Sequence, residues 1–124
     1  MGKESAFKSK MSFEARKNEV DKIRRKYPDR IPIICEKSEK SAIPEMSQKK
    51  FLVQESITVG EFLTIIRKNI KLNASESIFL FVDNTIPSTG SPLSVVYEDY
   101  KSKHPKDDGF LYLTYAGEAT FGNL

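Results

Sequence analysis

The clearest pattern of hydrophobic and polar positions in the chain lies over residues 58–72. Its hydrophobic positions recur at spacings of three and four residues, at Phe62, Ile65, Ile66 and Ile70. Because this period matches the helical turn of about 3.6 residues, the segment predicts an amphipathic helix, with Thr58 as a candidate N-cap. A weaker pattern of the same period predicts a second helix over residues 13–26, for which Ser12 is a good N-cap.

A different pattern, of short apolar runs rich in β-branched and aromatic residues, is typical of strands. Such runs are "IPIICE" at residues 31–36, "KKFLVQ" at 49–54, "SIFLFVDN" at 77–84 and "GFLYLTYA" at 109–116. A long polar connection that contains a proline joins the first two runs, so we expect them to form a hairpin.

Two shorter helices complete the predicted order of elements. One is an N-terminal arm over residues 5–10 that carries Phe7, and the other covers residues 93–101. The buried side of this last helix is expected to comprise Val96, Tyr97 and Tyr100. The complete order predicts an α+β domain in which one long helix crosses a single face of a mixed sheet of about four strands.

Length and composition place the chain among single-domain globular proteins. The 124 residues suit one compact core, and a content of 39% hydrophobic and 30% charged residues excludes a disordered or fibrous chain. No apolar run approaches the roughly 20 residues that span a bilayer, and the N-terminus lacks the apolar core of a secretory signal, so we expect the protein in the cytoplasm. The single cysteine, Cys35, excludes an internal disulfide and a cysteine-rich zinc site.

The charges are unevenly distributed along the chain. Residues 1–71 hold 17 Lys and Arg against 10 Asp and Glu, whereas residues 72–124 hold 3 against 7. A basic half of this kind can meet nucleic acid, an anionic membrane or acidic peptides. Binding of nucleic acid is not expected, because the sequence lacks the interleaved aromatic residues and the dense basic stripe of such proteins.

The sequence offers little for catalysis. Its only histidine, His104, lies in the charged stretch "KSKHPKDD", where we expect a solvated loop residue. A dyad of Cys35 and His104 is conceivable, but a lone cysteine in an apolar strand is usually part of the core. The sequence shows no phosphate-binding glycine loop and no cluster of metal ligands. We therefore predict a protein that is not an enzyme and that has no catalytic residues, cofactor or metal.

Five stretches in register carry a resemblance to a known family. They are "KIRRKYPDRIPIICEK", "KKFLV", "TVGEFLTIIRK", "IFLFVDNTIP" and "DDGFLYLTYAGEATFG". From Phe13 to Gly122 the chain closely resembles the autophagy ubiquitin-like modifiers, the GABARAP and light-chain-3 family. The resemblance implies a ubiquitin-like β-grasp domain over residues 28–118, preceded by a packed helical arm over residues 1–27 and followed by a flexible processing tail over residues 119–124.

The resemblance also implies a function for the C-terminal "TFGNL". In the family, a cysteine protease cuts after the glycine that follows an aromatic residue, here Gly122 after Phe121, and would remove Asn123 and Leu124. Activating and conjugating enzymes of the autophagy system would then join Gly122 to phosphatidylethanolamine, and the protein would move from the cytoplasm to autophagosome and vesicle membranes, where it supports membrane growth. Glycine suits these steps because it has no Cβ to block a narrow groove. The sequence would then be that of the unprocessed precursor.

The same resemblance predicts a peptide-binding edge. Receptors of the family present an aromatic residue and, three positions later, an aliphatic one, on a peptide that adds a strand to an exposed sheet edge. Residues 49–54 are the candidate edge, in which side chains alternate between the two faces of the strand. The resemblance assigns an aromatic pocket to Glu19, Ile23, Pro32, Lys50, Leu52 and Phe110. It assigns an aliphatic pocket to Phe51, Val53, Ile57, Phe62, Ile65 and Ile66, and electrostatic contacts to Arg30, Lys49 and Arg67.

Several of these assignments have an alternative. Phe62, Ile65 and Ile66 also have the helical spacing of core residues. Arg67 either serves the groove or stays solvated. If the tail is inert, the protein would instead be an unconjugated β-grasp adaptor in vesicle trafficking.

The N-terminal arm and two departures from the family pattern add further expectations. Phe7 and Phe13 are the candidate apolar anchors of the arm, which either packs on the domain or touches anionic lipid or microtubules. Gln54 stands where relatives commonly carry proline, a change that would alter the second pocket. "SKHPK" at residues 102–106 is expected to lengthen the loop before the last strand.

Overall fold

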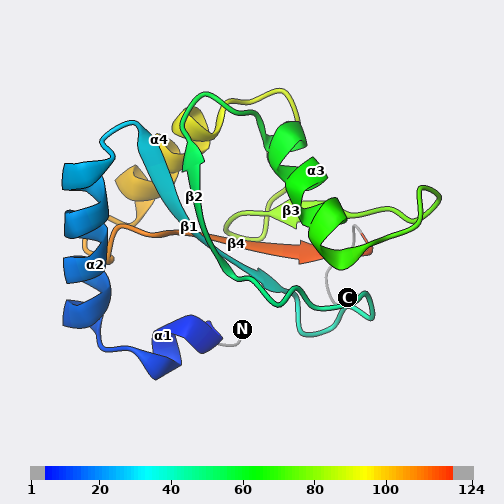
Figure 1. Ribbon diagram of the computed structural model, residues 1–124, viewed down its shortest axis with the longest axis horizontal. Helices are drawn as coiled ribbons and strands as arrows, with labels where there is room; N and C mark the ends of the chain where they lie inside the picture. The colour runs from blue at the N-terminus through cyan, green and yellow to red at the C-terminus, as the bar shows by residue number, and fades with distance from the viewer. Residues whose placement is uncertain (1–4, 119–124) are drawn as a thin grey trace.

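The order of helices and strands is the order that the hydrophobic pattern predicts. The computed structural model describes residues 5–118 (Figure 1). Its helices are α1 (Ala6–Lys10), α2 (Phe13–Lys26), α3 (Val59–Ile70) and α4 (Leu93–Lys103), and its strands are β1 (Arg30–Lys37), β2 (Lys50–Gln54), β3 (Phe79–Phe81) and β4 (Leu111–Ala116). Within the described residues, none of the helices has both the length and the apolar character needed to cross a bilayer.

The strands form one mixed four-stranded sheet in the order β2-β1-β4-β3, so β2 and β3 are its edges. β1 pairs antiparallel with β2 and parallel with β4, whereas β3 pairs antiparallel with β4. The predicted hairpin of the first two strands is therefore confirmed, and in its register Pro32 lies opposite Leu52. The parallel pairing places the first and the last strand side by side in the centre of the sheet.

Side-chain caps fix where the two long helices begin. Ser12 Oγ accepts the N–H of Ala15 at 3.1 Å at the start of α2. At the start of α3, Thr58 Oγ1 accepts the N–H of Glu61 at 3.1 Å, and the Glu61 carboxylate accepts the N–H of Thr58 at 2.8 Å. Such caps satisfy N–H groups that have no partner within the first helical turn. Both predicted N-caps are confirmed.

The main core lies between the sheet and the helices α3 and α4. Ile33 and Cys35 of β1 and Phe62 and Ile66 of α3 are all 0% exposed. Phe51 of β2 meets the ring of Phe62 edge to face, with 5.3 Å between the ring centroids. The predicted buried side of α4 is confirmed for Val96, Tyr97 and Tyr100.

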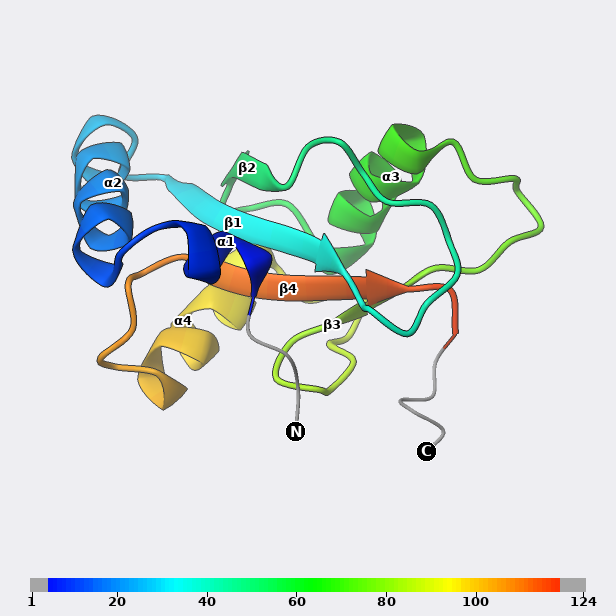
Figure 2. The ribbon, with the colours of Figure 1, turned by 90° about the horizontal axis from the view of Figure 1, so that it is seen from below.

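The opposite face of the sheet carries a second, smaller cluster that the N-terminal helices cover. Val20 of α2 packs there with Ile34 of β1 and with Phe110, which precedes β4. α1 lies across the middle of the sheet, in front of β1 and β4 in Figure 2. Phe7 of α1 joins the cluster, since its ring meets that of Phe110 edge to face at 5.2 Å between centroids. Phe13, in contrast, is 41% exposed and is not a buried anchor.

Polar contacts also attach α1 to the domain. Ser5 Oγ donates to a carboxylate oxygen of Glu36 at 2.6 Å. The Lys8 ammonium lies 3.1 Å from the Asp107 carboxylate and 4.4 Å from the centroid of the Tyr112 ring. The arm is therefore bound to β1, to β4 and to the loop before β4.

A buried ion pair joins α2 to the start of β4. The Arg16 guanidinium lies 3.0 Å from a carboxylate oxygen of Asp108, whose side chain is 0% exposed. Asp108 also accepts hydrogen bonds from the Tyr112 hydroxyl at 2.6 Å and from the Phe110 N–H at 2.9 Å. Burial, followed by the hydrogen bond to Asp108, raises the pKa of Tyr112. The sequence pattern did not reveal this pair.

Two predicted boundaries were wrong. α4 continues to Lys103, so Ser102 and Lys103 belong to the last turn of the helix and the loop before β4 begins at His104. The third strand ends at Phe81, because Asp83 and Asn84 adopt positive φ angles of 50° and 63° in a tight turn. Val82 and Thr85 exchange backbone hydrogen bonds across that turn. An apolar run alone does not show where such a turn begins.

Candidate functional site

β2 is the exposed edge that a peptide would join. It is the first strand in the sheet order, and its strand partner is β1. A strand at such an edge presents backbone N–H and C=O groups that a further extended segment can pair with. Along β2 the side chains alternate as expected, with Phe51 buried and with Lys50 and Gln54 exposed.

One side of this edge faces α2 and holds the residues assigned to the aromatic pocket. Lys50 reaches from β2 to α2, where its ammonium lies 2.5 Å from the Glu19 carboxylate. Leu52 is half-buried opposite Pro32, and Ile23 of α2 is also half-buried. Glu19 and Lys50 therefore pair across α2 and β2, and Leu52 lies opposite Pro32 in the β1–β2 register, while Ile23 lies on α2 four residues after Glu19.

The sixth residue of that set, Phe110, lies deeper than the others. It is 1% exposed and packs against Val20 and Ile34. Phe7 covers it edge to face, and the Lys50 ammonium lies 5.3 Å from the centroid of the Phe7 ring. Phe7 is thus a neighbour of the site that the motif-based assignment missed, although the sequence marked it as an apolar residue of the arm.

The other side of the edge faces α3 and holds the residues assigned to the aliphatic pocket. Phe51, Phe62 and Ile66 are buried members of the main core. Val53, Ile57 and Ile65 are half-buried and pack against that core from outside. The helical spacing of α3 left open whether its residues serve the core or a pocket; in the structure Phe62 and Ile66 fill the core, whereas Ile65 keeps accessible surface.

The three assigned cationic residues differ in what they contact. Arg67 donates from Nη1 to the backbone carbonyls of Asn73 at 3.1 Å and Glu76 at 2.8 Å, so it holds the loop after α3 and is not simply solvated. The Arg30 guanidinium lies 5.5 Å from the centroid of the Tyr27 ring. Lys49 is half-buried at the start of the edge.

Gln54 ends β2 opposite Arg30 in the register. Its carbonyl accepts the N–H of Ile57 at 3.3 Å, which forms a turn at the place where relatives were expected to carry proline. The half-buried Ile57 therefore follows the edge strand directly.

Neither residue of the conceivable catalytic dyad is free to react. Cys35 is 0% exposed, and burial raises the pKa of its thiol far above the ordinary range, so it stays protonated. His104 follows α4 and its side chain is 36% exposed, as expected of a solvated loop residue, but it also has partners: its Nε2 lies 3.0 Å from both carboxylate oxygens of Asp83, and its ring stacks on that of Tyr100 with 4.3 Å between centroids. His104 therefore connects the end of α4 to the turn after β3.

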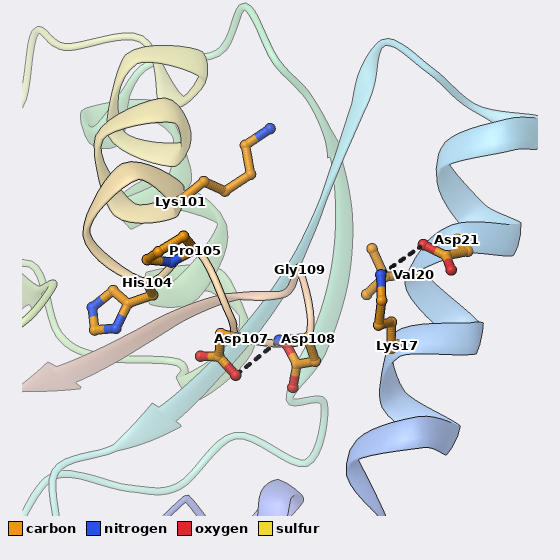
Figure 3. Close-up of a pocket in the computed structure, with 9 residues that line it drawn as sticks. All are labelled: Lys17, Val20, Asp21, Lys101, His104, Pro105, Asp107, Asp108 and Gly109. Carbon is orange, nitrogen blue, oxygen red and sulfur yellow. Dashed lines mark hydrogen bonds and ion pairs between the residues drawn. The ribbon is translucent and has the colours of Figure 1, made fainter.

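A surface hollow of about 160 Å³ lies between α2 and the loop before β4 (Figure 3). Lys17 and Asp21 of α2 line it and pair with each other at 3.7 Å. Gly109 forms part of the opposite wall with a φ angle of 100°, and a Cβ there would lie 2.8 Å from Val20 Cγ1. Only glycine lets the loop approach α2 so closely. No residue assigned to either pocket lines this hollow.

The predicted cleavage and lipidation site lies outside the described residues. Phe121, Gly122, Asn123 and Leu124 all belong to the segment that follows Glu118, the last described residue. The described part of the chain shows where that segment starts, since β4 ends at Ala116 and Gly117 follows it.

Comparison with known proteins identifies what the chain is similar to. A family model described as "Autophagy protein Atg8 ubiquitin like" matches residues 15–122. Autophagy-related protein 8e of Arabidopsis thaliana is 56% identical over 122 residues, which cover 98% of this chain and 97% of the relative. Autophagy-related protein 8 of Schizosaccharomyces pombe is 52% identical, with 97% of this chain and 96% of the relative covered.

Solved structures agree with this result. The crystal structure of Trypanosoma brucei ATG8 matches with a TM-score of 0.86 and 41% identity, over 97% of this chain and 100% of that one. Plasmodium falciparum Atg8, solved in complex with a Plasmodium falciparum Atg3 peptide, matches with a TM-score of 0.80 and 39% identity, over 93% and 98% of the two chains. The predicted ubiquitin-like fold, with two helices before a mixed four-stranded sheet, is confirmed.

Proposed function

Since this chain belongs to the Atg8 family of ubiquitin-like autophagy proteins, we propose that it is conjugated through Gly122 to phosphatidylethanolamine and recruits receptors through the β2 edge. Membership of the family shows that the chain is a ubiquitin-like protein of autophagy and not an enzyme. The site at the edge and the chemistry of the tail are our proposals.

The open edge of β2 is the observation that carries the receptor-binding part. A peptide that pairs with β2 would place alternate side chains toward α2 and toward α3. Its aromatic residue would meet the gap bounded by Glu19, Lys50 and Leu52, and its aliphatic residue would meet the half-buried Val53 and Ile65. The Atg3 peptide bound to the relative from Plasmodium falciparum supports a peptide-binding role for this chain.

Chemical-shift mapping would test the edge. A synthetic peptide with an aromatic residue and an aliphatic residue three positions later should shift the amide signals of β2, of α2 around Glu19 and of α3 around Ile65. A control peptide with alanine at both positions should cause no shifts. Shifts confined to the opposite edge, β3, would contradict the proposed site.

The conjugation part rests on the sequence of the tail. The family model extends to residue 122, where Gly122 follows Phe121. We propose that a cysteine protease removes Asn123 and Leu124 and that activating and conjugating enzymes of autophagy then attach Gly122 to the lipid amine. Covalent lipid would transfer the protein from the cytoplasm to autophagosome and vesicle membranes.

The substitution Gly122→Ala tests this part in cells that carry out autophagy. The unaltered protein should lose Asn123 and Leu124, as shown by intact mass, and should give a faster-migrating lipidated band. The variant should give no lipidated band, while the matched control Gly90→Ala should behave as the unaltered protein, because a Cβ at Gly90 meets only Ser88 Oγ, at 4.0 Å. An unchanged lipidated band in Gly122→Ala would refute conjugation through this residue.

The second candidate is an unconjugated adaptor in vesicle trafficking, because the β2 edge is complete without the tail. In that case the edge would bind peptides while the tail stays intact in cells. The contacts of Phe7 and Lys8 with the domain favour a packed arm over one that is free to reach microtubules or anionic lipid.

A further inference from the structure

Directly after β4, the backbone is hydrogen-bonded to the connection between β1 and β2. The N–H of Gly117, directly after β4, donates to Ser41 Oγ at 2.9 Å. Ser41 is 7% exposed. Among the described residues, the buried polar or charged residues are Ser41, Arg16 and Asp108, and Arg16 and Asp108 pair with each other. A buried hydroxyl needs a partner, and Gly117 supplies one.

Ser41 is itself held in place by the connection. Its N–H donates to the carbonyl of Ser38 at 3.1 Å, and its own carbonyl accepts from the Lys37 ammonium at 2.7 Å. The N–H of Ser38 donates to the carbonyl of Tyr115 at 2.8 Å. The connection is therefore hydrogen-bonded to two residues at the end of β4 and just after it, Tyr115 and Gly117.

Gly117 is required there for space. A Cβ at this position would lie 2.5 Å from Ile43 Cγ2 and 3.7 Å from Ser41 Oγ. The first distance is far shorter than an ordinary contact between carbon atoms, which is about 3.5–4.0 Å. Ile43 is half-buried against the main core, so it cannot simply turn away. A larger residue at position 117 would push either the connection or the chain out of position.

We propose that Ser41, Ile43 and Gly117 form a clamp that fixes where the C-terminal tail leaves the domain and so positions Gly122 for the enzyme that processes it. The inference rests on the proposed function and adds positioning residues to it. The five peptide units from residue 117 to residue 122 span at most about 18 Å when fully extended. An enzyme that docks on the domain must therefore place its catalytic group within that distance of the clamp, and a displaced clamp lowers the fraction of productive complexes.

Processing kinetics in an extract of Arabidopsis thaliana cells would test the clamp. The full chain and its variants serve as substrates, and intact mass follows the removal of Asn123 and Leu124 as substrate concentration is varied. Gly117→Ala should lower the maximal rate by about tenfold to a hundredfold, since a misplacement of about 1 Å can cost about a hundredfold, while KM stays within about twofold because the docking surface is unchanged. The control Gly90→Ala should match the unaltered chain in both parameters.

Two further variants separate positioning from loss of folding. Ile43→Leu keeps the side-chain volume but removes the Cγ2 methyl, so the double variant Gly117→Ala/Ile43→Leu should recover most of the maximal rate. Ser41→Ala removes the hydrogen bond from the Gly117 N–H, and with it the long one from the Ile43 N–H at 3.5 Å, and should slow processing by about threefold to tenfold. Ser41→Thr, which keeps the hydroxyl, should stay near the unaltered rate.

The outcomes are distinguishable. If the unaltered chain itself is not processed, the proposed function fails. If it is processed and Gly117→Ala is processed equally fast, the clamp is refuted while the function stands. The clamp is also refuted if Gly117→Ala is slow but Ile43→Leu brings no recovery, or if the rates of the variants merely follow their melting temperatures.

Discussion

The buried pair of Arg16 and Asp108 gives the sharpest prediction for stability. Asp108 is 0% exposed and Arg16 is 9% exposed in their side chains, and their charged atoms are 3.0 Å apart. Replacing one member of a buried pair leaves the other charge without compensation and typically costs about 3–5 kcal/mol. In Arg16→Met, Asp108 keeps its hydrogen bonds from Tyr112 and Phe110, so we expect a loss near the lower end, about 3 kcal/mol.

Lys17→Met is the matched control on the same helix. Lys17 is 53% exposed and lies 3.7 Å from Asp21, a surface pair of the kind that contributes about 1 kcal/mol or less. Both variants replace a cation by methionine, so their difference isolates the burial of the pair. For a domain with a total stability of about 5–15 kcal/mol, a loss of about 3 kcal/mol is a large fraction.

Equilibrium unfolding in guanidinium chloride would measure the difference. The chain has no tryptophan, so circular dichroism of the helices is the appropriate signal. Arg16→Met should lower the midpoint with an unchanged m value, because the exposed surface on unfolding stays the same. A free energy of unfolding within about 1 kcal/mol of that of Lys17→Met would refute the assignment of an uncompensated buried charge.

Three further predictions concern the edge, the core and alkaline pH. Lys50→Ala should weaken a peptide with an acidic residue beside its aromatic by about threefold to fivefold in calorimetric titration at low salt, and the exposed Lys68→Ala should not. Ile66→Ala, at a residue 0% exposed, should cost about 2–5 kcal/mol in chemical unfolding, whereas Ile65→Ala should cost less and instead reduce peptide affinity; equal costs would contradict the division between core and site. Because the folded pKa of Tyr112 is raised, stability should be full below its unfolded pKa of about 10 and should fall as pH rises beyond it, less steeply in Tyr112→Phe; equal slopes would argue against this source.

Much of the fold could be predicted from the sequence because its signals are local. The N-caps Ser12 and Thr58 and the spacing of Phe62 and Ile66 lie within a few residues of the structures that they specify. The end of β3 was missed because it depends on the positive φ angles of two residues within an apolar run. The pair of Arg16 and Asp108 was missed because 92 residues separate its members.

For the candidate site, too, the sequence predicted the local features and missed those that depend on contacts between distant segments. The alternation along residues 49–54 predicted which side chains of the edge share a face. Whether a residue of α3 fills the core or keeps accessible surface depends on how the helix is rotated against the sheet, and the sequence does not specify that rotation. The position of Phe7 over Phe110 likewise arises only when the arm folds back across the sheet.

The place of β4 in the sheet has a consequence for protein synthesis. β4 is the last strand among the described residues, yet it lies between β1 and β3 and joins them. Contacts between distant parts of a chain form slowly, because a long loop must close before they bring any gain. On the ribosome, therefore, β1 stays unpaired on its β4 side until residues 111–116 have emerged. A nascent chain that stops before residue 111 would leave β1 open to strands of other molecules, and would need a chaperone to keep it from aggregating.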